Sequence, residues 1–217
     1  MTCGSSSRSR RIGKTRADSR AVRAVGLERT LSVLAAWAAI AGNAIAGPEV
    51  FRIDPEATRA EFAVDHFWVT TLHGRFGRAN GTVVLDQEAH AGSIDFIIEA
   101  ESVDTGWSVR DDFIRGEHMF DASRFPQMRF RATNLAFDRT ELVGASGELT
   151  MHNVTRPVAV RVERMDCVPE GRGEADRCGV SVVSSIRRSD FGMTFGLPFV
   201  GDDIDLSFHL SARRVSP

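Results

Sequence analysis

Residues 204–210 read Ile-Asp-Leu-Ser-Phe-His-Leu, so apolar and polar side chains alternate at every position. Because successive side chains of a β-strand point to opposite faces, this pattern predicts a strand with one face in water and the other in an apolar core. The same alternation recurs after residue 50, in residues 61–65, 94–99, 128–132 and 158–163. The sequence therefore predicts an all-β protein.

Turn-forming residues separate the alternating runs. Asn80-Gly81, Ala91-Gly92 and residues 138–140 are of the types that favour chain reversal. About eight strands at this spacing predict a β-sandwich or a barrel. A barrel leaves no exposed strand edge, so we predict a single antiparallel β-barrel domain over residues 47–217.

One stretch breaks the alternation. Within residues 108–115 the apolar side chains recur at helical spacing, Ser108 suits the N-cap position, and Gly116 suits the end of a helix. This stretch predicts a short helical cover over one mouth of the barrel.

Residues 1–46 have the composition of a targeting segment. They hold eight of the 27 Lys and Arg residues but few acids, and an uncharged apolar run of 16 residues from Leu31 ends in Ala44-Ile45-Ala46. Signal peptidase accepts such a small-x-small ending, whereas a membrane span needs about 20 apolar residues. We predict a signal peptide that is cleaved after Ala46 and a periplasmic or secreted protein, with a membrane anchor as the alternative.

The remaining chain is acidic. It holds 19 arginines, no lysine and 27 acidic residues, which gives a net charge of −8. Because nucleic-acid binding depends on cationic side chains, we predict no nucleic-acid partner.

Two cysteines, Cys167 and Cys178, remain after the leader. An even number of cysteines in an exported protein favours a disulfide, and two cysteines without a nearby histidine make a poor zinc site. We predict a Cys167–Cys178 disulfide and no metal.

The six histidines and the acidic pairs Asp111-Asp112 and Asp202-Asp203 form no catalytic signature. The sequence contains no H-E-x-x-H, no G-x-S-x-G and no phosphate-binding glycine loop. We predict a protein that is not an enzyme and has no catalytic residue; a hydrolase that uses a histidine or an acid at the mouth is the minor alternative.

The aromatic content is unusual, with 14 Phe and no Tyr. In one interpretation the rings fill a narrow barrel to crystal-like density. In the other they wall a cavity, which an eight-stranded barrel is just wide enough to provide for one small ligand. Periodicity alone leaves both interpretations open.

The most specific motifs of the chain are residues 187–193 (RRSDFGM) and 199–204 (FVGDDI). Further motifs precede them in residues 53–55, 62–66, 74–76, 110–115, 117–130 and 147–157. In this order, over about residues 51–212, they resemble the YceI-like family of exported polyisoprenoid-binding proteins. The cysteine pair resembles a subgroup of that family with a disulfide at this place.

The resemblance implies an extended, lipocalin-like barrel of eight strands with an elongated cavity for one isoprenoid chain. The ligand would be a polyprenyl phosphate or a quinone, bound non-covalently and carried or stored without any other cofactor. We expect transient contact with a membrane, and a homodimer is left open. The rival function is a stress-related structural or interaction module with a packed barrel.

The inward side chains of the strands and the cover are expected to form the site. The expected cavity residues are Phe62, Val64, Phe67, Phe76, Phe96, Ile98, Phe113, Phe120, Phe130, Phe191, Met193 and Phe208. Arg110, Arg115 and Arg188 are candidates for an anionic head group, because a guanidinium binds phosphate through two hydrogen bonds. Surface ion pairs are the alternative role for each arginine.

Overall fold

The computed structural model describes residues 47–168 and 177–215, so the expected signal peptide lies outside the described residues. Within these ranges the chain forms eleven strands, one α-helix, α1 (Ser108–Arg115), and two short 3-10 segments, η1 (Ala100–Ser102) and η2 (Arg188–Phe191). The strands are β1 (Glu49–Ile53), β2 (Arg59–His66), β3 (Thr70–Phe76), β4 (Ala79–Asp86), β5 (Ala91–Glu99), β6 (Val103–Asp104), β7 (Gln127–Asp138), β8 (Glu141–Met151), β9 (Val154–Val168), β10 (Arg177–Arg187) and β11 (Val200–Val215).

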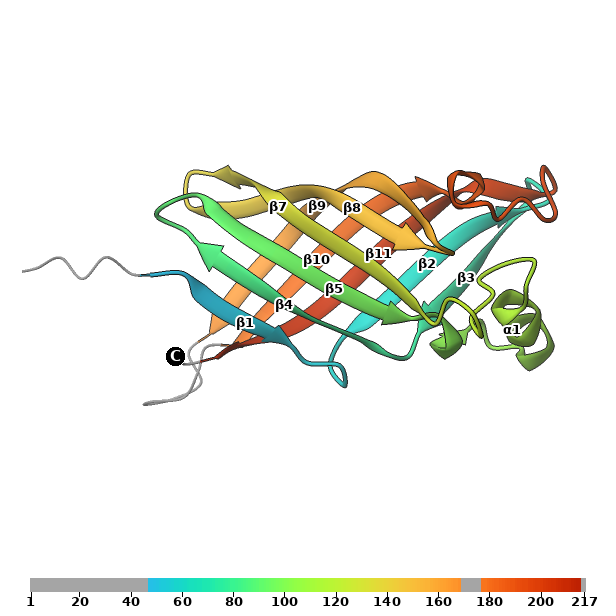
Figure 1. The fold of residues 1–217 in the computed structure, drawn as a ribbon, viewed down its shortest axis with the longest axis horizontal. Helices are drawn as coiled ribbons and strands as arrows, with labels where there is room; N and C mark the ends of the chain where they lie inside the picture. The colour runs from blue at the N-terminus through green and yellow to red at the C-terminus, as the bar shows by residue number, and fades with distance from the viewer. Residues whose placement is uncertain (1–46, 169–176, 216–217) are drawn as a thin grey trace, which may run out of the picture. The chain divides into compact units, whose positions relative to one another are not determined.

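These strands form a closed barrel of eight chain passes (Figure 1). β1 and β2 pair one after the other with β11, and together they make one pass. β3 and β4 make the next pass, which pairs with β2 and β1 on one side and with β6 and β5 on the other. β5 with β6, and then β7 to β11, supply the remaining six passes, and every pairing is antiparallel. The prediction of an eight-stranded antiparallel barrel is confirmed.

The strands are long enough to make the barrel an extended one. β9 has 15 residues and β11 has 16. At about 3.3 Å per residue, a strand of this length spans roughly 50 Å. The inward side chains of such strands can line a channel much longer than it is wide.

Two expected turns lie inside strands instead. Asn80-Gly81 belongs to β4, and Ala91-Gly92 opens β5. A Cβ atom at Gly81 would stand 2.5 Å from the carbonyl oxygen of Asp95 on the neighbouring strand. This glycine therefore allows a close approach of two backbones, and the prediction of a reversal at Asn80-Gly81 was wrong.

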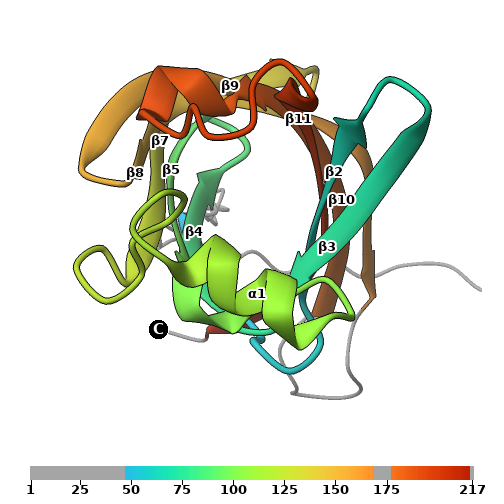
Figure 2. The ribbon, with the colours of Figure 1, turned by 90° about the vertical axis from the view of Figure 1, so that its right-hand side faces the viewer.

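Helix α1 covers one end of the barrel, which we call the α1 end (Figures 1 and 2). Its bounds are those predicted, although the N-cap residue is Trp107 and not Ser108. The side chain of Asp111 accepts a hydrogen bond of 2.8 Å from the Thr105 amide and so fixes the helix to the preceding loop. The β2–β3 turn and residues 192–199 reach the same end, and the β4–β5 and β7–β8 turns lie at the opposite end, which we call the far end. No helix of the described residues is long and apolar enough to cross a bilayer.

Candidate ligand-binding site

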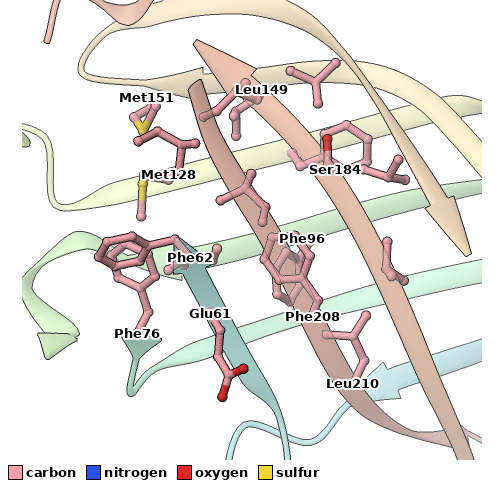
Figure 3. A pocket seen from close by; sticks show the side chains of 18 of the residues that line it. Glu61, Phe62, Phe76, Phe96, Met128, Leu149, Met151, Ser184, Phe208 and Leu210 are labelled. Carbon is pink, nitrogen blue, oxygen red and sulfur yellow. The ribbon is translucent and has the colours of Figure 1, made fainter. Parts of the chain in front are cut away.

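The interior of the barrel holds a cavity of about 410 Å³. Its lining runs from Phe113 at the α1 end to Ala212 at the far end, so the cavity follows the barrel axis. Figure 3 shows the middle of this space, where Phe96 and Phe208 lie beside each other with Leu210 nearby. A barrel packed solid with phenyl rings would leave no such space.

Hydrocarbon side chains make up nearly the whole wall of the cavity. Among the described residues that line it, the polar or charged ones are Glu61, His66, Arg110, Ser184 and Arg188. The lining at the far end is apolar and comprises Phe51, Ile53, Leu142, Met165, Cys178, Val180, Leu210 and Ala212. Polarity is therefore confined to the middle and to the α1 end.

The phenyl rings of the wall pack against one another in edge-on and tilted contacts. The ring centroids of Phe96 and Phe208 lie 5.7 Å apart, and Phe76 lies 5.5 Å from Phe62 and 5.7 Å from Phe120. Such pairs contribute about 0.5–1.5 kcal/mol beyond the burial of their area. They fix the shape of the cavity.

Ten of the twelve expected cavity residues line this space. They are Phe62, Val64, Phe76, Phe96, Ile98, Phe113, Phe120, Phe130, Met193 and Phe208. Apart from Val64 and Ile98, the aliphatic part of the wall was not among the expected residues. It includes Leu149, Val158, Val160, Val180, Val182, Ile186 and Leu206.

Phe67 does not line the cavity, which corrects the prediction for this residue. β2 ends at His66, so Phe67 lies beyond the strand that points Phe62 and Val64 into the cavity. Phe67 lies in the β2–β3 turn with φ of 53°, and 51% of it is exposed. Its amide donates a hydrogen bond of 2.7 Å to the carbonyl of Phe199.

Phe191 also lies outside the cavity lining. It closes η2 and is only 1% exposed, so it is packed within the core. Its carbonyl oxygen lies 3.2 Å from Nδ1 of His152, next to the β8–β9 turn. Phe191 therefore supports the wall from behind.

Arg188 is among the residues that line the cavity, but its guanidinium is bound to the protein's own backbone, which disfavours the head-group role predicted for it. The residue is 2% exposed and donates hydrogen bonds of 2.7–2.9 Å to the carbonyls of Met193, Phe195, Val200 and Gly201. Burial lowers the pKa of this guanidinium, and the nearby Asp202 carboxylate opposes that shift. Arg188 holds the loop between η2 and β11 in place.

Asp202 fixes the other side of the same loop. Its two carboxylate oxygens accept hydrogen bonds from the amide (2.9 Å) and the hydroxyl (2.7 Å) of Ser189. Burial raises the pKa of Asp202, but these hydrogen bonds and the charge of Arg188 outweigh it, so the pKa lies below its ordinary value. Asp202, one residue of the acidic pair Asp202-Asp203, is thus a structural carboxylate.

The other two candidate arginines differ in position. Arg115 is not among the residues that line the cavity and donates to the carbonyls of Glu101 (2.9 Å) and Val103 (2.7 Å), which disfavours its expected head-group role. Arg110 lines the cavity at the α1 end and donates to Oγ1 (2.7 Å) and the carbonyl (2.8 Å) of Thr105. Of the three arginines, Arg110 brings a positive charge to the mouth through an accessible side chain.

The predicted disulfide is present. Cys167 and Cys178 lie opposite each other on β9 and β10, and their Cα atoms are 4.0 Å apart. Cys178 is buried and forms part of the cavity wall at the far end. Among the described residues, no three His, Cys, Asp or Glu side chains come together in a way that could hold a metal ion.

Comparison with known proteins identifies the family. The family description of the YceI-like domain matches residues 51–212, which is most of the chain. The chain belongs to the YceI-like family. Curated relatives include the UPF0312 protein ECA1782 of Pectobacterium atrosepticum, which is 28% identical over 87% of this chain and 98% of its own length. Protein YceI of Salmonella arizonae is 28% identical over 76% of this chain and 86% of its own length.

Solved structures share the YceI-like fold. BcnA of Burkholderia cenocepacia superposes with a TM-score of 0.62 at 24% identity, over 73% of this chain and 98% of its own. A domain from Saccharophagus degradans, described as polyisoprenoid binding and implicated in plant cell wall breakdown, gives a TM-score of 0.60 at 18% identity, over 76% of this chain and 98% of its own. At these identities the likeness concerns the fold.

Proposed function

We propose that this protein is exported and holds one isoprenoid lipid, a polyprenyl phosphate or a quinone, inside its barrel for carriage or storage, without acting as an enzyme. The observation that carries the proposal is the long hydrocarbon-walled cavity with polar side chains at one end. The description of a YceI-like neighbour as polyisoprenoid binding supports the same ligand class.

The energetics favour a long apolar chain. Each CH₂ group transferred from water to the wall contributes about 0.8 kcal/mol. A chain of tens of carbon atoms thus offsets the cost of association and of ordering the chain. A short or polar molecule gains little from such a wall.

The distribution of polar groups sets the direction of the ligand. The lining of the far end is apolar, so the hydrocarbon tail belongs there. The head group belongs at the α1 end, where Arg110 and His66 line the cavity. A guanidinium forms charge-assisted hydrogen bonds with a phosphate, which makes Arg110 the contact expected to distinguish an anionic head group from a neutral one.

The proposal is tested by filling the cavity from one strand of its wall. Val160 lines the cavity from β9, whereas its neighbour Ala159 is exposed on the outer face. We expect Val160→Trp to weaken the binding of a long-chain ubiquinone to delipidated protein at least tenfold, because the indole occupies the space of the tail. Ala159→Trp is the matched control and should bind like the unaltered protein. Equal affinities of two folded variants would contradict the proposal.

The role of Arg110 is tested with two ligands that share an isoprenoid tail. We expect Arg110→Ala to weaken binding of a polyprenyl phosphate about tenfold or more, since a hydrogen bond to a charged group contributes about 1.5–3 kcal/mol. Binding of the neutral quinone should change little. Equal losses for both ligands in an isothermal titration would show that Arg110 does not read the head group.

A further inference from the structure

Exposed apolar side chains gather at the α1 end. Three segments far apart in the sequence supply them: the β2–β3 turn, α1 with the residue before it, and the loop before β11 (Figure 2). Each of these side chains is between 41% and 82% exposed. We call this set the aromatic rim; it comprises Phe67, Trp68, Val69, Trp107, Val109, Phe113, Phe195 and Phe199.

The other exposed large apolar residues in the described ranges include no aromatic side chain. They are Val50, Val143, Val168 and Val215, all at or near the far end. Every exposed Phe and Trp side chain of the described residues lies in the rim. A clustered apolar patch of this type marks an interaction site, because scattered single residues are the ordinary condition of a protein surface.

The rim continues directly into the cavity. Phe113 and Phe195 are about half exposed, yet both also line the cavity, and their ring centroids lie 4.9 Å apart. An apolar chain that leaves the cavity past these rings passes the rest of the rim. If the rim faced water, the apolar chain would be exposed to water as it left the cavity, which is unfavourable.

The backbone of the β2–β3 turn is strained in a way that keeps two rings outside. Phe67 and Trp68 have φ of 53° and 58°, a region that bulky residues rarely occupy. Turns of this kind ordinarily use Asn-Gly. Rings of the turn and of the loop before β11 meet here, since Phe199 lies 5.9 Å from both Phe67 and Trp68. The fold accepts strain at a place where the rings gain no burial in the core.

We propose that the aromatic rim docks the barrel on the surface of a lipid bilayer, with the mouth of the cavity opening toward the acyl chains. The inference rests on the proposed function, because a membrane-borne cargo is what requires this contact. Trp and Phe suit the boundary between head groups and acyl chains. The net charge of −8 after residue 46 disfavours attraction to anionic lipids, so insertion of the rim into zwitterionic lipid provides the binding.

The tryptophans allow a direct test. The ring of strands is closed by hydrogen bonds within residues 49–215, so residues 47–217 are used for the measurement. In that chain Trp68 and Trp107 are the two indoles, and both belong to the rim. With phosphatidylcholine vesicles we expect a blue shift of the fluorescence and quenching by lipids spin-labelled near the head group. Phosphatidylglycerol should not strengthen the effect and high salt should not abolish it, because apolar insertion provides the binding. An unshifted, unquenched spectrum in phosphatidylcholine would overturn the proposal.

Matched variants distinguish binding through the rim from non-specific adsorption to vesicles. In one variant Trp68, Val69 and Phe199, none of which lines the cavity, are changed to serine. The control changes Val50, Val143 and Val168 to serine. We expect the rim variant to float with the vesicles at least tenfold less than the unaltered chain, and the control to float normally. Equal flotation of the two variants would overturn the proposal.

Quinone binding is measured in parallel, in detergent and without vesicles. The rim variant should bind the quinone as the unaltered chain does. If the unaltered chain binds quinone but does not associate with vesicles, the docking proposal fails and the proposed function stands. If it binds neither the quinone nor a polyprenyl phosphate, the proposed function fails. A rim that joins two copies in analytical ultracentrifugation, with no vesicle binding, would also overturn the docking proposal.

Discussion

At one place a single glycine opposite a phenyl ring sets the width of the cavity. Gly74 on β3 lies opposite Phe62 on β2, and a Cβ atom at Gly74 would stand 2.3 Å from Cζ of the Phe62 ring. The absence of a side chain at this one position lets the ring lie against the strand. The free width of the cavity near its middle therefore depends on a glycine that has no special backbone conformation.

We predict that Gly74→Val pushes the ring of Phe62 into the cavity and weakens quinone binding at least tenfold, with a smaller effect on folding because the ring is free to turn. Gly179→Val is the matched control, since a Cβ there meets nothing within 4 Å. Binding is measured by titration of delipidated protein. Unchanged affinity in Gly74→Val would mean that the ligand does not use this part of the interior.

Arg188 shows a second effect at the residue scale. Because four backbone carbonyls share this guanidinium, we predict that Arg188→Met lowers the free energy of unfolding by about 3–5 kcal/mol. The neighbouring Arg187 pairs with Asp190 at the surface, so Arg187→Met should cost less than about 1 kcal/mol. Urea unfolding measures both values. Similar losses in the two variants would contradict the structural role of Arg188.

At the scale of elements, the disulfide joins the ends of β9 and β10 far from the mouth. It closes a loop of 12 residues, counting Cys167 and Cys178 themselves. We predict that the double variant Cys167→Ala, Cys178→Ala unfolds with a free energy about 3 kcal/mol lower, as the chain-entropy model gives for a loop of this size. Chemical denaturation with and without reductant measures the effect. Adding reductant should lower the free energy of unfolding of the unaltered protein but not that of the variant. A variant whose stability depends on reductant would contradict the prediction.

The helix and the strands also show how much of the fold can be predicted from the sequence. Alternation predicted parts of β2, β5, β7, β9 and β11, and helical spacing predicted the bounds of α1, because burial of one face decides both. The end of β2 at His66 was not predictable, since only pairing with β11 and β3 ends that strand. Phe67 lies in the turn beyond that end, and its expected place in the cavity was wrong. Likewise, the carbonyls that accept hydrogen bonds from Arg188 belong to residues up to 13 positions away. No local motif predicts these hydrogen bonds.

At the scale of the whole barrel, the two ends differ in a way that fits one task. The far end has an apolar lining and a disulfide, and the α1 end has the polar lining, the helical cover and the aromatic rim. The hollow interior was one of two alternatives that the sequence left open, because periodicity gives the face of a side chain but not the space left beside it. The family resemblance favoured the cavity, and the structure contains it.

The central claim is that this interior holds a single isoprenoid lipid, and native mass spectrometry of protein purified from its own host tests it most directly. We predict one added mass per barrel, which organic extraction releases as a polyprenyl phosphate or a quinone and which the Val160→Trp variant lacks. Protein that carries no lipid as purified, and still binds none when mixed with either ligand after delipidation, would contradict the account.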